Sequence, residues 1–163
     1  MNDLQFILQY AKVNNIINKM QCRNLIEYSF DIVKLQIPEL LEQSKYLEIA
    51  ELLFDKKFRI IKIQELISFI LWVRDEILHI NKIEKAKLHN NTEPELIQAG
   101  IKQLDVFGNI NIIDSLANGD VLKWDLILQL PYYRVLDKLA KSNVENQIQK
   151  NYQKIMEQKS KRK

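Results

Sequence analysis

The sequence predicts a mainly α fold: a single-domain helical bundle with a long central helix, several short helices and a long C-terminal helix. Leu, Ile, Lys, Glu and Gln are abundant, and the 163 residues include only 3 Gly and 3 Pro, a composition that favours helix. Apolar residues repeat at helical spacing over residues 63–88. Every glycine and two of the three prolines fall between Pro94 and Pro131, so this stretch is expected to contain several short helices.

The chain is expected to form one domain. Its 163 residues are a usual length for a single domain, and 47% of them are apolar, which is enough for a hydrophobic core. We place the domain at residues 1–158, with the cluster of short helices at 92–139. Residues 159–163 form a basic C-terminal tail.

The N-terminal segments carry one clear pattern and one ambiguous pattern. Leu4, Ile7 and Leu8 lie at helical spacing and predict a helix within residues 4–20. In residues 25–37, apolar side chains alternate with polar ones as in a half-buried strand, yet some of them also fit a helical stripe. The sequence leaves both strand and helix open for this segment.

Pro38 is expected to open the next helix, because a proline at the first helical position loses no hydrogen bond. That helix is predicted over residues 38–54 and is expected to bury Leu40, Leu47 and Phe54 on one side. A polar break follows at residues 55–57.

The strongest helical pattern covers residues 63–88. Its apolar positions recur at alternating steps of three and four residues and are Ile63, Leu66, Ile70, Val73, Ile77 and Ile80. Further apolar residues, Trp72 among them, occupy other faces of the middle of this helix. We therefore expect the helix to lie at the centre of the core, with neighbours on two sides.

Caps and glycines divide the next part of the chain. Thr92 and Glu95 have the spacing of a capping box, and this predicts a helix that ends at Gly108. A second helix is predicted over residues 110–118, before Gly119.

Asp120 is expected to cap a third short helix that runs to residue 130, where Pro131 interrupts it. The last helix is predicted over residues 132–159, and its apolar face narrows towards the C-terminus. After Leu139 a single line remains, formed by Ala140, Val144, Ile148, Tyr152 and Ile155. A line this narrow buries little against its own domain. It is either a frayed extension or a surface completed by another chain, and Ile148 and Tyr152 are therefore candidate partner-binding residues.

Aromatic and apolar side chains gather around the Pro131 break. Trp124, Pro131, Tyr132 and Tyr133 are candidate partner-binding residues, because exposed aromatic side chains often dominate protein interfaces. The alternative is plain packing, in which Trp124 and Leu128 dock on the helix of residues 63–88, and we favour packing for Trp124. Consecutive helical residues point in different directions, so one tyrosine of the pair is expected to reach solvent.

No active site, metal site or cofactor is predicted, and we expect a non-enzymatic protein. Four residues partly match a calcium-binding loop: Asp114, Asn118, Gly119 and Asp125. Leu116 stands where that loop needs an oxygen ligand, and a helix stop at Asn118 explains the same residues. His79 and His89 do not form a zinc-ligand spacing, and they are expected to lie on a helix surface.

The formal net charge of +3 is unevenly distributed. Residues 134–163 contain nine Lys or Arg against three Asp or Glu, whereas the preceding part carries a small negative excess. A basic tail of this kind is able to contact nucleic acid, but no second basic patch supports such contact, so a solvated tail is favoured.

A cytoplasmic location is expected. Cys22 is the single cysteine and therefore excludes an internal disulfide, and the N-terminus lacks the pattern of an export signal. The most apolar run, residues 66–73, is far shorter than the roughly 20 residues of a membrane-spanning helix.

Residues 93–139 resemble part of a known protein family. The segments AGIKQLDVFG and DSLANGDVLKWDLILQLPYYRVLDKL, followed by a helix rich in Lys and Gln, are similar to the C-terminal part of tail assembly chaperones and related tail-morphogenesis proteins of tailed phages. The resemblance implies a non-enzymatic assembly protein that binds the apolar, helical tape-measure protein in the host cytoplasm. Trp124, Pro131 and Tyr132 are the matching positions.

Two other functions remain open from the sequence. The first is a structural component of a phage virion, such as a tail, neck or packaged protein. The second is a nucleic-acid-binding regulator that uses the basic tail. The expected partner is another protein, and the sequence leaves self-association open.

Overall fold

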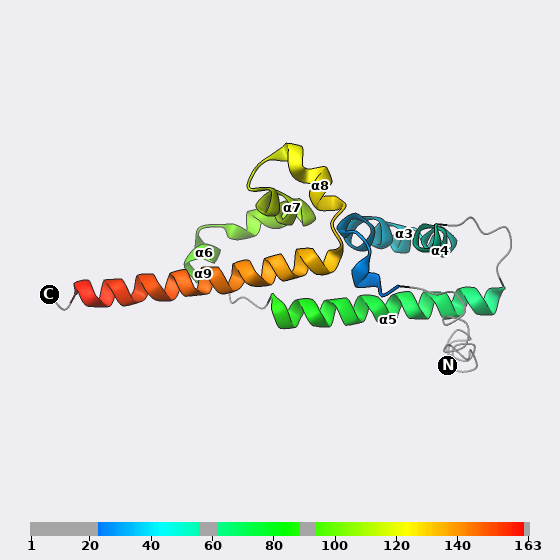
Figure 1. The fold of residues 1–163 in the computed structure, drawn as a ribbon, viewed down its shortest axis with the longest axis horizontal. Helices are drawn as coiled ribbons and strands as arrows, with labels where there is room; N and C mark the ends of the chain where they lie inside the picture. The colour runs from blue at the N-terminus through cyan, green and yellow to red at the C-terminus, as the bar shows by residue number, and fades with distance from the viewer. Residues whose placement is uncertain (1–22, 56–61, 89–93, 162–163) are drawn as a thin grey trace.

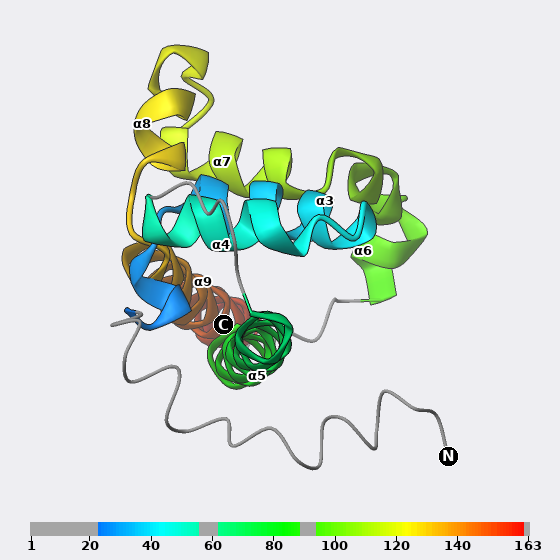
Figure 2. The same cartoon turned by 90° about the vertical axis from the view of Figure 1, so that its right-hand side faces the viewer.

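The computed structural model describes residues 23–55, 62–88 and 94–161, and in these ranges the chain is helical apart from turns and one isolated β-bridge. Two long helices, α5 (Ile63–Lys87) and α9 (Tyr132–Ser160), run beneath a layer of shorter helices and lie beside each other only where α5 ends and α9 begins (Figures 1 and 2). The predicted mainly α domain, with a long central and a long C-terminal helix, is confirmed. The expectations for residues 4–20, Thr92, His89 and residues 162–163 lie outside the described residues.

The segment that the sequence left open between strand and helix is mostly helical. It contains η1 (Leu25–Glu27), the π-helical turn η2 (Ile32–Gln36) and the start of α3 (Ile37–Glu42). Phe30, Val33 and Ile37 are buried at helical spacing. Within this segment only Ser29 forms a β-bridge, and its partner is Pro131. The strand-like alternation of apolar and polar residues therefore does not produce a strand.

Pro38 does not begin its helix, contrary to the prediction. The Val33 N–H already donates to the Ser29 carbonyl at 3.0 Å, so helical geometry starts well before the proline. Because Pro38 has no N–H, it cannot bond the carbonyl four residues earlier, that of Lys34. The side chain of Asn109 donates to this carbonyl instead, at 3.1 Å. Pro38 therefore leaves the Lys34 carbonyl free to bond Asn109, which is far away in the sequence.

The single helix expected over residues 38–54 is also wrong. It is broken after α3 by a turn in which Ser44 takes a left-handed conformation, with φ of 56°. The second piece, α4 (Tyr46–Phe54), buries Ile49, Ala50 and Leu53, whereas Leu47 is 39% exposed. Leu40 and Phe54 pack partly buried against the core as expected, so the prediction of a buried side fails only at Leu47.

The long helix α5 matches its prediction in extent and in its contacts on several sides. It packs against η1, α4 and α9, and buries Phe69, Val73 and Ile80. Its first residue, Ile63, is 74% exposed. The repeat read from the sequence thus describes the buried face in the middle of the helix better than at its start.

The helix expected to run as far as Gly108 is interrupted. Gly100, with φ of 89°, separates α6 (Pro94–Gln98) from the 3-10 helix η3 (Ile101–Phe107). Glycine takes this left-handed backbone conformation without the steric cost of a Cβ, and the chain turns there. A break at this glycine was not predicted from the sequence.

The two following helices agree with their predictions. Helix α7 (Asn109–Ala117) stops at Asn118 and Gly119, both with positive φ, which confirms the helix stop. The Asp120 carboxylate accepts the Leu122 N–H at 3.1 Å and so caps η4 (Val121–Lys123), which continues into α8 (Trp124–Leu128).

Helix α9 begins at Tyr132, as predicted, and runs parallel to α5 but is displaced along it (Figure 1). Only the first turns of α9 lie beside the end of α5, where Lys87 Nζ and Asp137 Oδ1 are 2.7 Å apart. The remainder of α9 extends past the end of α5 (Figure 1). We call residues 141–161, the rest of α9 and its capping residue Lys161, the arm.

Candidate partner-binding surfaces

The junction at Pro131 is held by two backbone hydrogen bonds. The Phe30 N–H donates to the Leu130 carbonyl, and the Tyr132 N–H donates to the Tyr28 carbonyl, each at 2.8 Å. These bonds form the β-bridge between Ser29 and Pro131. The start of α9 is therefore fixed to the chain between η1 and η2.

Tyr132 is a core residue and not a surface contact. Its side chain is 2% exposed and its ring lies 5.9 Å from that of Phe30. Its hydroxyl donates to Glu84 Oε1 at 2.6 Å, and Lys34 Nζ approaches the same oxygen at 2.5 Å. Lys34 Nζ also lies 5.1 Å from the centre of the Tyr132 ring, a cation–π distance. One carboxylate thus joins α9, α5 and η2.

Burial and the Glu84 carboxylate raise the pKa of Tyr132 well above its ordinary value. The folded chain therefore keeps a proton that the unfolded chain loses above about pH 10. This difference stabilises the fold fully below that pH, and the stabilisation falls above it by up to about 1.4 kcal/mol per pH unit.

We expect Tyr132→Phe to lower the free energy of unfolding near neutral pH by about 1.5 to 3 kcal/mol, because it removes a hydrogen bond to a charged group. The gap between the wild-type chain and the variant should shrink from about pH 10 upwards, because only the wild-type chain carries this titration. Urea denaturation across that pH range measures the gap. A gap that stays constant or widens contradicts the assignment.

The other residues predicted at this junction differ in exposure. Tyr133 is 39% exposed, its hydroxyl accepts a hydrogen bond from Arg134 Nε at 3.2 Å, and it is the tyrosine of the pair that reaches solvent. Pro131 is half-buried. Trp124 is half-buried and packs against the core, as favoured, but α8 packs on α7 and lies away from α5 (Figures 1 and 2). The predicted docking of Trp124 on the long helix is wrong.

The arm carries the apolar line that the sequence predicted, and it is uncovered. Its side chains are about half to two-thirds exposed, with Ile148 at 62%. The arm stripe consists of Val144, Ile148, Tyr152, Ile155 and Met156. The arm is continuous helix as far as Ser160, so the stripe lies on a regular helical surface.

A second apolar surface was missed by the sequence analysis. It lies on α6, η3 and the first turn of α7, and Val106 is 82% exposed there. We call it the lobe patch, and it consists of Leu96, Ile97, Leu104, Val106, Phe107 and Ile110. Its residues lie on both sides of Gly100, where a break in the helix was not predicted.

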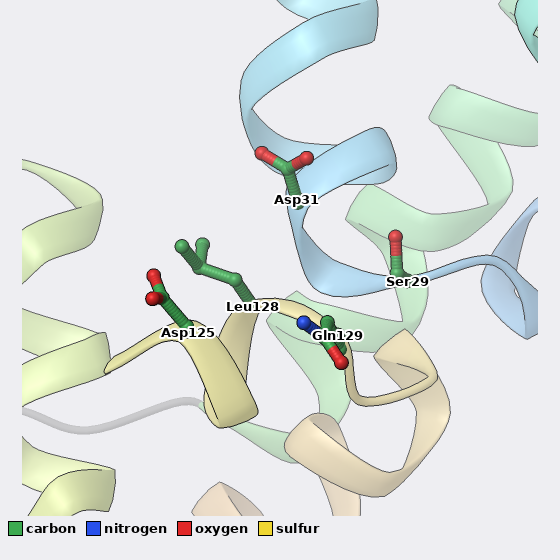
Figure 3. Close-up of a pocket in the computed structure, with 5 residues that line it drawn as sticks. All are labelled: Ser29, Asp31, Asp125, Leu128 and Gln129. Atoms are coloured by element: carbon green, nitrogen blue, oxygen red, sulfur yellow. The ribbon is translucent and has the colours of Figure 1, made fainter. Parts of the chain in front are cut away.

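An open hollow of about 380 Å³ lies between α8 and the stretch of chain that links η1 to η2. Asp31 lies on one side of it, and Asp125, Leu128 and Gln129 lie on the other (Figure 3). The Asp31 carboxylate accepts a hydrogen bond from the Gln36 side chain. Among the residues that the structure describes, no group of three or more metal-ligating side chains occurs.

No helix in the described ranges is both long and apolar enough to cross a lipid bilayer. Comparison with models of protein families, with curated proteins and with solved structures gave no match.

Proposed function

We propose that this chain is a non-enzymatic assembly protein that binds an apolar helical segment of a partner protein. The observation that supports this proposal is the arm, a continuous helix that leaves the bundle with its apolar stripe exposed. An unpaired amphipathic helix of this kind is typical of recognition between helices.

The spacing of the stripe suits a helical partner. Val144, Ile148 and Tyr152 follow at steps of four residues, and Ile155 follows at a step of three. Rows of this kind form the ridges that pack into the grooves of a second helix. The partner then contributes the apolar surface that the narrow stripe lacks.

The resemblance of residues 93–139 to tail assembly chaperones adds a biological setting to this proposal. In that setting the partner is the tape-measure protein of a phage tail, and binding keeps its apolar helices from aggregating in the host cytoplasm. The alternative role in the same setting is a structural component of the virion. The two roles differ in whether the chain remains in purified particles at fixed stoichiometry, since a chaperone leaves the assembled tail.

Binding is tested with a synthetic amphipathic helical peptide that has Leu at its core positions and Glu at the flanking positions, labelled for fluorescence anisotropy. We expect the wild-type chain to bind it and the Ile148→Ser/Tyr152→Ser variant to bind at least about tenfold more weakly, because both side chains lie in the stripe.

The matched control is Asn146→Ser/Gln153→Ser, which changes the same number of side chains on the opposite side of the arm. Asn146 precedes Ile148 by two residues and so lies about 160° from it around the helix. This control should bind like the wild-type chain. Equal binding by the stripe variant and the wild-type chain would remove the support for the proposal.

A further inference from the structure

The lobe and the arm carry net charges of opposite sign. Residues 94–128, which we call the lobe, contain five acidic residues and two lysines. The acidic residues are Glu95, Asp105, Asp114, Asp120 and Asp125. Lys123 Nζ lies 2.8 Å from Asp120 Oδ2, so one of the two lysines is already paired within the lobe.

The arm carries an excess of positive charge, whereas the lobe carries an excess of negative charge. Residues 141–161 contain five lysines and two glutamates. Lys141 Nζ lies 3.1 Å from Glu145 Oε1, so one glutamate is paired within the arm. Both surfaces remain exposed in the single chain, and its own arm does not cover its own lobe patch.

We infer that the arm of one copy of this chain binds the lobe patch of a second copy. Apolar side chains are then buried on both surfaces, and the net positive charge of the arm is brought close to the net negative charge of the lobe. Complementary charge fixes the orientation and speeds the encounter of two such surfaces. In the 3-10 helix, residues three apart share a face, so Leu104 and Phe107 present their side chains together to the incoming arm.

This contact joins two different surfaces and is therefore heterologous. Each copy in the middle of an assembly uses its arm on one neighbour and its lobe patch on the other. Contacts of this type produce a ring when the rotation between copies closes, and an open chain otherwise. The inference does not rest on the proposed partner, although a second copy and a partner helix would compete for the same arm stripe.

Contacts between two like surfaces are disfavoured by charge. Two paired arms bring together ten lysines and four glutamates, and two paired lobes bring together ten carboxylates and four lysines. Salt weakens attraction between opposite charges and also weakens repulsion between like charges. The arm–lobe contact should therefore weaken as salt is raised, whereas an arm–arm contact should strengthen.

The experiment measures association of the purified chain by sedimentation velocity over a range of concentrations. The arm variant is Ile148→Ser/Tyr152→Ser and the lobe variant is Val106→Ser/Phe107→Ser. Leu78→Ser is the matched control, because Leu78 is an exposed apolar residue of α5 outside both surfaces. Circular dichroism checks that every variant keeps the helical content of the wild-type chain.

We expect the wild-type chain and Leu78→Ser to associate, and each of the two double variants to remain monomeric alone. An equal mixture of the two double variants should form a one-to-one dimer and nothing larger, because the mixture holds one intact arm and one intact patch per pair. Raising salt from about 0.05 M to about 0.5 M should weaken association of the wild-type chain by at least about tenfold.

Three outcomes would overturn the inference. The first is a wild-type chain that stays monomeric at every concentration. The second is a lobe variant that associates as well as the wild-type chain, which indicates contact between arms. The third is association that becomes stronger with salt. Because no partner peptide is present, none of these outcomes bears on the peptide-binding test of the proposed function.

Discussion

Replacing Phe30 with alanine is expected to lower the free energy of unfolding by about 3 to 5 kcal/mol. Phe30 is among the largest fully buried side chains, and its ring packs at 5.9 Å from that of Tyr132 at the start of α9. Truncation removes the buried ring and leaves a cavity that the surrounding helices only partly fill. Since domains are stable by about 5 to 15 kcal/mol, this is a large fraction of the total.

The matched control is Phe107→Ala, which makes the same chemical change at a half-exposed position on η3. It should cost about 1 kcal/mol, because roughly half of the ring is already in water. Urea denaturation at a concentration too low for self-association gives both values. Equal costs for the two substitutions would show that Phe30 is not a core residue.

Replacing Glu84 with alanine is expected to lower the free energy of unfolding by about 2 to 3 kcal/mol. The Glu84 carboxylate accepts from the Tyr132 hydroxyl and pairs with Lys34, whose side chain is only 20% exposed. Without Glu84, a buried hydroxyl and a mostly buried ammonium lose their common partner. Partial exposure of the pair keeps the expected cost below that of a fully buried ion pair.

Asp137→Ala is the matched control for Glu84→Ala. Asp137 forms a salt bridge of similar length with Lys87, but both side chains are well exposed. Exposed pairs contribute about 0 to 1 kcal/mol, so this substitution should change stability little. Thermal or urea unfolding of the two variants compares the pairs, and a larger loss for Asp137→Ala would contradict the role given to Glu84.

The long helices were predictable because their signals are local and repeated. The apolar spacing of α5 extends over many turns, and the narrowing line on α9 is visible in the sequence itself. The stops at Asn118 and Gly119 and the cap at Asp120 depend on residue types with a fixed conformational preference. Such signals need no knowledge of the tertiary fold.

The errors arose where a tertiary contact decides the local structure. A proline in a continuing helix is tolerated at Pro38 because Asn109, far away in the sequence, takes the carbonyl of Lys34. Spacing alone cannot reveal such a partner. The turn at Ser44 has a similar consequence, since a left-handed serine is rare enough that the pattern favours one unbroken helix.

The candidate surfaces were predicted in part. The exposed stripe on the arm follows from its narrowness, and Ile148 and Tyr152 are exposed as the sequence analysis required of partner-binding residues. Tyr132 was misjudged, because its burial depends on Glu84 and Lys34, which come from two other helices. The lobe patch was not predicted, because one helix was expected on both sides of Gly100, where the chain turns instead.

The unbroken course of α9 from its buried start to its free end has a mechanical consequence. The 29 residues of α9 form a rod of about 44 Å, so a tilt of about 10° at its base displaces the tip by roughly 8 Å. Substitutions around Tyr132 that alter this angle would therefore misalign the distant stripe without changing any of its residues. The packing of the core around the start of α9 therefore controls the position of its far end, and with it the precision of any contact that the far end makes.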